Sequence, residues 1–200
     1  MMRTHKRVVV FGGAFNPPHI GHAMMIEAAT RLSHPDEIWV MPSKDRGDKK
    51  VSASGEDRLR MLELMSEDLS FQSFPVPVMI SNFELRLPGL TRTVETKEAL
   101  EHAHPDVLFE FLIGSEILPD IKTKWVRGEE LWQSGHFLVL ARVSEIPKDL
   151  PSNFIVLGEG SRGADISSTF IRELVSHGAS GMPYVTPRVA EFIQEKGLYR

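Results

Sequence analysis

The chain has 200 residues, of which 42% are hydrophobic and 25% charged, a composition typical of a folded globular domain rather than a disordered or fibrous segment. Its formal net charge of −4 and pI near 6.1 argue against a general binder of nucleic acid or of anionic membranes, which would carry a basic field. The sequence has no cysteine, which excludes disulfides, thiolate nucleophiles and cysteine-ligated zinc and fits a cytoplasmic protein. We expect one domain over residues 1–200, and the apolar run near its start is too short for a signal sequence or a membrane span.

Six short apolar runs along the chain are typical of buried strands. Several of them show no alternation with polar residues, as a sheet covered on both faces requires. The runs cover residues 8–11, 37–41, 76–80, 106–113, 136–142 and 153–157.

Helical patterns separate these runs, over residues 22–32, 56–69 and 94–102. Such β-α-β alternation predicts an α/β fold: a doubly wound, Rossmann-like, mostly parallel sheet with helices on both faces. Two further amphipathic helices, "SSTFIRELVSHG" and "TPRVAEFIQEKG", each end at a glycine in the C-terminal third. We expect these C-terminal helices to cap the sheet.

The first strand runs into an unusual turn, "VVVFGGAFNPPHIGH". A strand followed by Gly-Gly, a loop and a helix is the geometry in which a ligand phosphate meets backbone N–H groups at a helix start. Gly12 and Gly13 allow close approach of the backbone to a nucleotide, and the two following prolines stiffen the loop. His19 and His22 are three residues apart, so both rings can point the same way and donate to phosphate.

Other interpretations of this turn compete with phosphate binding. The letters match neither Gly-x-Gly-x-x-Gly nor Gly-x-x-x-x-Gly-Lys-Ser/Thr, which argues against dehydrogenase-type and P-loop sites. His-x-x-His could be half of a metal site, although no carboxylate stands at helix-ligand spacing. A structural glycine-proline turn with incidental histidines also remains open.

A second candidate anion site lies late in the chain, in "DISSTFIRELV". Ser167, Ser168 and Thr169 stand at the start of a predicted helix, and Arg172 follows about one turn later on the same face. Hydroxyls, helix N–H groups and a guanidinium together can bind phosphate. The alternative is an ordinary N-cap followed by a surface arginine.

Taken together, "GGAFNPPHIGH" and "ISSTFIR" resemble the nucleotidyltransferase superfamily, whose members pair a His-x-Gly-His turn with an Ile-Ser-Ser-Thr-x-x-Arg helix start. Within it the sequence is most similar to the bacterial nicotinate/nicotinamide mononucleotide adenylyltransferases, over nearly the whole chain. The supporting segments keep that family's order: "TRTVET" (91–96), "LIGSEILPDIKTKW" (112–125), "FLVLAR" (137–142) and "VAEFIQEKGLY" (189–199).

The resemblance implies transfer of an adenylyl group from ATP, accompanied by Mg²⁺, to a pyridine mononucleotide, with release of pyrophosphate. It implies His22, His19 and Arg172 as catalytic residues and ATP and a pyridine mononucleotide as partners, while the net charge argues against nucleic acid and membrane. The residues implied for ATP binding are Gly12, Gly13, Ala14, Phe15, His19, His22, Ser168, Thr169 and Arg172. Those implied for the acceptor are Thr93, Trp125, Glu116 and Arg142.

The sequence departs from the family pattern mainly on the acceptor side. Glu95 and Glu116 stand where the family has aspartate, and Arg92 replaces the usual tyrosine. The loop "MPSKDRGDKK" lacks the family's histidine and leaves Lys44, Lys49 and Lys50 as candidates for the phosphate lysine. These departures keep open another phosphorylated acceptor, such as phosphopantetheine, and a non-catalytic nucleotide sensor.

Structural roles compete with binding at two acceptor positions. Trp125 and Trp132 are seven residues apart and could form one buried helical stripe. Thr93 could cap the helix that follows it.

Overall fold

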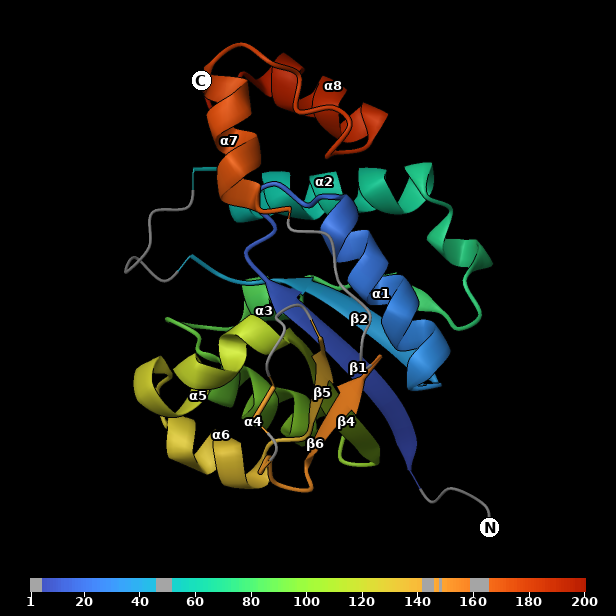
Figure 1. Ribbon diagram of the computed structural model, residues 1–200, viewed down its shortest axis with the longest axis vertical. Coiled ribbons are helices and arrows are strands. Elements are labelled where there is room, and N and C mark those ends of the chain that lie inside the picture. Colours follow the sequence, from blue (N-terminus) through green and yellow to red (C-terminus); the bar gives the residue numbers. More distant parts are fainter. Residues whose placement is uncertain (1–4, 46–51, 142–145, 148, 159–165) are drawn as a thin grey trace.

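A computed structural model of the protein describes residues 5–45, 52–141, 146–147, 149–158 and 166–200. Its centre is a six-stranded parallel sheet in the order β3-β2-β1-β4-β5-β6 (Figure 1). The strands are β1 (Lys6–Gly13), β2 (Glu37–Pro42), β3 (Val78–Ile80), β4 (Val107–Gly114), β5 (Phe137–Leu140) and β6 (Phe154–Leu157). Each of the six apolar runs therefore forms a strand, and the predicted doubly wound parallel fold is confirmed.

Helices connect the strands, and they include the five predicted from the sequence. These five are α1 (Ile20–Leu32), α2 (Gly55–Asp68), α4 (Thr93–Ala103), α7 (Ser168–Ser176) and α8 (Pro187–Lys196). The sequence patterns missed the short helices α3 (Phe83–Arg86), α5 (Leu118–Lys124) and α6 (Gly128–Ser134), and the single 3₁₀ turns at Phe71–Ser73 and Ser115–Ile117. No helix among the described residues is long and apolar enough to cross a bilayer.

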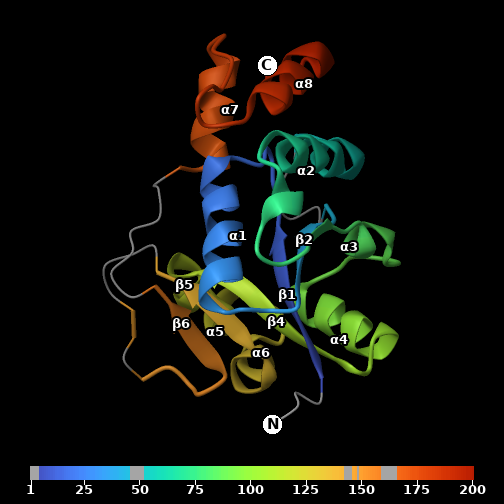
Figure 2. The ribbon, with the colours of Figure 1, turned by 90° about the vertical axis from the view of Figure 1, so that its right-hand side faces the viewer.

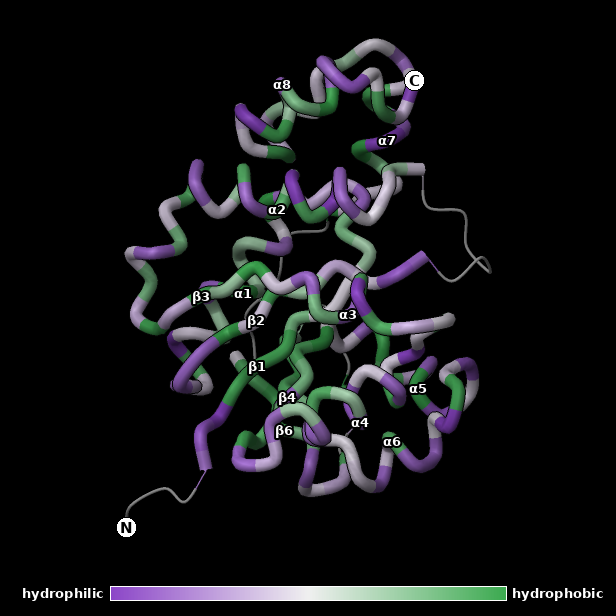
Figure 3. The backbone as a smooth tube through the Cα atoms, turned by 180° about the vertical axis from the view of Figure 1, so that it is seen from behind, coloured by the Kyte–Doolittle hydropathy of each residue, from purple (hydrophilic) through white to green (hydrophobic). Residues whose placement is uncertain are grey.

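Alternate residues of β1 face the two halves of the core. Val9 and Phe11 pack with the apolar sides of α1, α2, α7 and α8, whereas Val8 and Val10 pack with those of α4, α5 and α6. Figure 2 shows α1 and α4 on opposite sides of the sheet, and Figure 3 shows hydrophobic residues concentrated in the central strands. Because both faces are covered, the strands read as continuous apolar runs.

The two C-terminal helices lie at the end of the molecule toward which the carboxyl ends of the strands point (Figure 1). There α8 packs against α2. Ile171 from α7 and Ile193 from α8 are buried in the same core half as α1 and α2. The C-terminal helices thus extend the layer on one face of the sheet rather than forming a separate cover over it.

An ion pair fastens the opposite, amino-terminal end of the sheet. On β1, Arg7 places Nη2 2.6 Å and Nε 3.0 Å from the same carboxylate oxygen of Glu110 on β4. The remaining guanidinium nitrogen of Arg7, Nη1, donates to the carbonyl of Ser33 at 3.1 Å. Both charged side chains are largely buried, so each is satisfied by the other rather than by water.

Candidate active site

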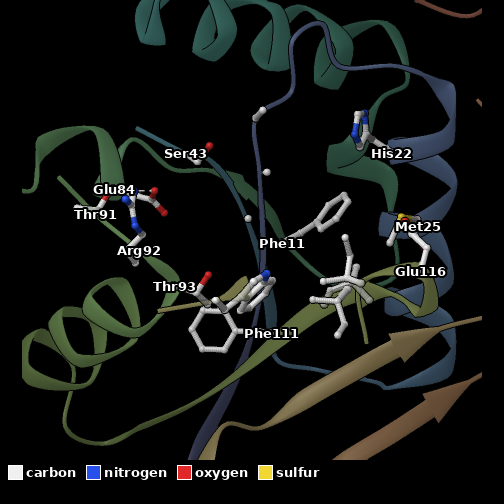
Figure 4. A pocket seen from close by; sticks show the side chains of 18 residues that line it. Phe11, His22, Met25, Ser43, Glu84, Thr91, Arg92, Thr93, Phe111 and Glu116 are labelled. Carbon is white, nitrogen blue, oxygen red and sulfur yellow. Dashed lines mark hydrogen bonds between the residues drawn. The ribbon is translucent and has the colours of Figure 1, made fainter. Parts of the chain in front are cut away.

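A cavity of about 390 Å³ opens where β1 and β4 end. These two strands are neighbours in the sheet, and the chain order reverses between them, which is where open α/β sheets bind ligands. Figure 4 shows the lining, with His22 and Met25 across the cavity from Thr91, Arg92 and Thr93. The full lining is Phe11, Gly12, Gly13, Ala14, His22, Met25, Ser43, Glu84, Thr91, Arg92, Thr93, Phe111, Leu112, Ile113, Gly114, Glu116, Ile117 and Trp125.

The glycine turn forms one wall of this cavity. A Cβ atom placed on Gly12 would meet nothing within 4 Å, so the backbone there faces open space that a ligand can fill. A Cβ on Gly13 would lie 3.2 Å from the ring of Phe15, which is why that position is tight. Phe15 itself has a φ of 47°, in the left-handed region, and its ring is buried behind the turn.

The two histidines of the turn begin α1 as a capping box. His19 is the N-cap, and its backbone N–H donates to Nδ1 of His22 at 3.1 Å. Because Nδ1 accepts this bond, neutral His22 carries its proton on Nε2, which makes that nitrogen the donor of the ring. The ring of His19 is buried and stacks on that of His22 with centroids 3.6 Å apart, so His22 lines the cavity and His19 supports it.

The second motif contacts the first directly. Ser167 caps α7 by accepting from the N–H of Phe170, as the sequence pattern indicates. Ser168 Oγ donates to the carbonyl of Pro17 at 2.8 Å, and Arg172 Nη1 donates to the carbonyl of Asn16 at 2.8 Å. The structure thus brings together two segments about 150 residues apart in the chain.

These motif residues do not all face the same space. Thr169 is exposed at the start of α7, where its hydroxyl accepts from Arg172 Nη2 at 3.1 Å. Ser168, Thr169 and Arg172 lie against the Asn16–Pro17 side of the turn and are not part of the cavity lining.

The predicted acceptor residues that the structure describes all line the cavity, but two structural alternatives are wrong. Thr93 does not cap α4: Arg92 is the N-cap, and its N–H donates to Glu95 at 2.8 Å in a second capping box. Trp125 and Trp132 do not share a stripe, because Trp125 ends α5 and Trp132 lies within α6.

Glu116, the third of these residues, folds back toward the strand end. A Cβ on Gly114 would lie 2.1 Å from a carboxylate oxygen of Glu116. Only a glycine at position 114 therefore leaves room for the Glu116 carboxylate at the end of β4.

Of the three candidate lysines and Arg142, the structure describes only Lys44. Lys44 donates from Nζ to the carbonyl of Leu87 at 2.5 Å, and its backbone N–H donates to Glu84 at 3.1 Å. Lys49, Lys50 and Arg142 lie outside the described residues.

The sequence motifs did not indicate two further residues whose side chains donate hydrogen bonds to the turn. Arg58 on α2 is buried and donates from Nη1 to the carbonyl of Ala14 at 2.8 Å. Tyr199, next to the chain end, donates from its hydroxyl to Asn16 Oδ1 at 2.8 Å. A signal for Arg58 exists in the sequence, since it stands four residues before Leu62 on the apolar stripe of α2.

A doubly wound sheet with a glycine turn after its first strand, and with two helix starts in contact at that turn, is the architecture typical of nucleotide-binding α/β proteins. Residues 10–174 match the model of the cytidylyltransferase-like family. Two relatives named "Probable nicotinate-nucleotide adenylyltransferase" are each 32% identical over 200 residues. The one from Halalkalibacterium halodurans covers 98% of this chain and 92% of its own length, and the one from Myxococcus xanthus covers 99% and 97%. The chain belongs to the cytidylyltransferase-like family, and within it to the nicotinate-nucleotide adenylyltransferases.

A solved structure shares the fold over the whole chain. Plasmodium falciparum nicotinic acid mononucleotide adenylyltransferase, complexed with NaAD, superimposes with a TM-score of 0.81 at 22% identity, covering 98% of each chain. At 22% identity the similarity supports the fold alone, and it agrees with the six-stranded parallel sheet described above.

Proposed function

We propose that the protein transfers the adenylyl group of ATP to the 5′-phosphate of nicotinate or nicotinamide mononucleotide. The products are the dinucleotide and pyrophosphate, a reaction of NAD biosynthesis. The observation that carries the proposal is that one cavity has the Gly12–His22 turn on one side and Thr93 and Trp125 on the other. Membership in the nicotinate-nucleotide adenylyltransferases supports the same choice.

On the ATP side, each proposed contact uses a group suited to phosphate. The backbone of Gly12 to Phe15 approaches the nucleotide, and Nε2 of His22 donates to the α-phosphate as its charge grows. Arg172 has donors beyond the two used on Asn16 and Thr169, because a guanidinium carries five N–H groups. With Ser168 and Thr169 at the start of α7, it would hold the β- and γ-phosphates that leave as pyrophosphate.

The chemistry needs no nucleophile from the protein, because the phosphate dianion of the acceptor attacks the α-phosphorus itself. The new phosphoanhydride bond joins the acceptor phosphate to the α-phosphorus, and the bond from the α-phosphorus to the oxygen that bridges the α- and β-phosphates breaks, so that this oxygen leaves with pyrophosphate. Catalysis therefore consists of in-line positioning and of stabilising the charge on the α-phosphate and the leaving group.

Mg²⁺ enters with ATP in this proposal. The described residues contain no group of three or more His, Asp or Glu side chains arranged to hold a metal ion. An ion bound mainly by phosphate oxygens and water suits such a site, since Mg²⁺ retains several waters when it binds with a nucleotide.

On the acceptor side, Trp125 offers an aromatic face for the pyridine ring. The Thr93 hydroxyl and neighbouring backbone would hydrogen-bond the ring substituent. Glu116 would lie near a ribose, and Arg142 would lie near the acceptor end. We also propose that residues 1–200 form one domain and that the protein works in the cytoplasm.

A panel of acceptors tests the proposal. The purified protein is incubated with ATP and Mg²⁺ and either nicotinate mononucleotide, nicotinamide mononucleotide or phosphopantetheine, and pyrophosphate is followed. We expect release with a pyridine mononucleotide only. Release with phosphopantetheine alone would assign the site to another acceptor, and ATP binding without release from any of them would make the protein a sensor.

A further inference from the structure

A fully buried arginine lies beneath the phosphate-binding turn. Arg58 is 1% exposed, donates from Nη1 to the carbonyl of Ala14 at 2.8 Å, and donates from Nε to the carbonyl of Ala53 at 3.3 Å. Burial lowers the pKa of its guanidinium, and the nearby Tyr199 hydroxyl and acidic side chains oppose that shift. An arginine remains charged at neutral pH, so a buried cation here is costly and calls for a role.

Asn16, two residues along the turn, is held by three other segments. Its carbonyl accepts from Arg172, its Oδ1 accepts from the hydroxyl of Tyr199 at 2.8 Å, and its Nδ2 donates to Ser52 Oγ at 3.3 Å. Burial raises the pKa of the Tyr199 phenol well above its usual range, opposed by the charges of Arg172 and Arg58. The hydroxyl therefore keeps its proton and remains a donor at any ordinary pH.

These contacts flank the one residue of the turn in an unfavourable conformation. Phe15 has a φ of 47°, which costs free energy for any residue other than glycine and persists only where the surroundings enforce it. The carbonyl before it, on Ala14, is held by Arg58, and the carbonyl after it, on Asn16, is held by Arg172. The turn is thus fixed on both sides of its strained residue.

The conformation of Phe15 connects directly to His22. The Phe15 ring is 1% exposed and meets the His22 ring edge-on, with centroids 4.8 Å apart, and the Phe11 ring at 5.3 Å. A Cβ on Gly13 would also touch that ring. A shift of Phe15 would therefore move both the imidazole and the glycine backbone that line the cavity.

We propose that Arg58 and Tyr199 are positioning residues for the ATP half of the reaction, acting through Ala14, Asn16 and Phe15 on His22. The inference rests on the proposed function. The two residues bind carbonyl and amide oxygens on the far side of the turn, and a carbonyl oxygen held by a guanidinium is not available to face a triphosphate. Neither side chain lines the cavity, and each donates a hydrogen bond to the turn itself, so we assign both to positioning rather than to substrate contact.

Tyr199→Phe is the sharpest test, because it removes one oxygen atom from a side chain that is otherwise unchanged. At a temperature where every variant is folded, kcat/KM for ATP should fall about tenfold, the effect of losing one well-placed hydrogen bond. KM for the acceptor should stay at the wild-type value. Tyr184→Phe is the matched control, since the Tyr184 ring packs on Phe170 and its hydroxyl makes no hydrogen bond to any residue that the structure describes.

Arg58→Ala and Arg58→Lys extend the test to the buried cation. Both should lower kcat/KM for ATP more than Tyr199→Phe does, with lysine no substitute for a planar guanidinium. Added guanidinium ion should restore part of the activity of a folded Arg58→Ala protein and none of that of Arg58→Lys. If Arg58→Ala does not fold, Tyr199→Phe decides alone.

The outcomes separate this inference from the proposed function. Wild-type protein that releases no pyrophosphate with any acceptor would refute the function. The affinity for a non-hydrolysable ATP analogue, measured by calorimetry, would then still test Tyr199, with a weakened affinity expected. Tyr199→Phe protein that is merely less stable, or that loses acceptor and ATP affinity equally, would overturn the positioning role.

Discussion

The two ends of β1 use arginine in opposite ways. At the amino-terminal end, Arg7 pairs with the carboxylate of Glu110 on the neighbouring strand. At the carboxyl end, Arg58 and Arg172 donate to backbone carbonyls of the turn that follows the strand. A cation bound to a carboxylate is neutralised, whereas a cation bound to a carbonyl shapes the backbone and keeps its charge for an anionic ligand.

This difference in the use of arginine suggests that the amino-terminal end of β1 contributes to stability and that the carboxyl end contributes to phosphate binding. The Arg7–Glu110 pair ties β1 to β4 far from the cavity. The glycine turn, by contrast, leaves open space above Gly12 and has a strained residue in Phe15. Changes at the two ends should therefore affect different measurements, and the following predictions test that separation in order of expected size.

His22→Ala should give the largest effect, at the carboxyl end. Removing the Nε2 donor from the α-phosphate should lower kcat about a thousandfold, the usual cost of losing one donor to a developing charge. The circular dichroism spectrum should stay that of the wild type, and the free energy of unfolding in urea should fall by only about 1 kcal/mol, the cost of losing the capping contact with His19. His102→Ala, an exposed substitution on α4, is the control. A His22→Ala enzyme with near wild-type turnover would remove the basis for the phosphate assignment.

Glu110→Ala should give the next largest effect, at the amino-terminal end. It leaves the Arg7 guanidinium buried and without its carboxylate, so the free energy of unfolding in urea should fall by about 3 kcal/mol. At a temperature where the variant is folded, kcat should not change. Lys6→Ala breaks the more exposed pair with Glu37 and should cost less than about 1 kcal/mol. Equal losses in the two variants would show that burial does not set the strength of the Arg7–Glu110 ion pair.

The sequence was sufficient to predict the sheet, because each of the six strands is buried and therefore appears in the sequence as an apolar run, independently of the helices between the strands. It placed the start of α1 at His22 rather than Ile20, since His19 is not a usual cap residue. It missed the break between α5 and α6, where Arg127 adopts a φ of 52° and Gly128 packs against the backbone of Ile121. Backbone contacts of that kind leave no periodic pattern.

The candidate site was predictable where a motif occupies one segment and not where the contacts span the chain. His22 and Arg172 each stand in a short motif. Tyr199 reaches Asn16 across 183 positions, and nothing local in the sequence indicates that contact. Arg58 stood on an apolar helical stripe, where a charge needs a partner, and only the fold shows that the partner is a carbonyl of the turn.

Trp125→Ala should give the smallest effect, and it divides the carboxyl end itself into an ATP half and an acceptor half. Losing an aromatic face that stacks on the pyridine ring should raise KM for the acceptor about tenfold and leave KM for ATP unchanged. Trp132→Ala is the matched control, because that ring packs on Phe154 with centroids 4.6 Å apart and lies outside the cavity. Both variants lose aromatic packing and some stability, so a rise in acceptor KM confined to Trp125→Ala would assign the effect to the cavity. If KM for the acceptor rises equally in both variants, the effect comes from the shared core beneath α5 and α6. The acceptor would then have to be recognised by the Thr93 side of the pocket.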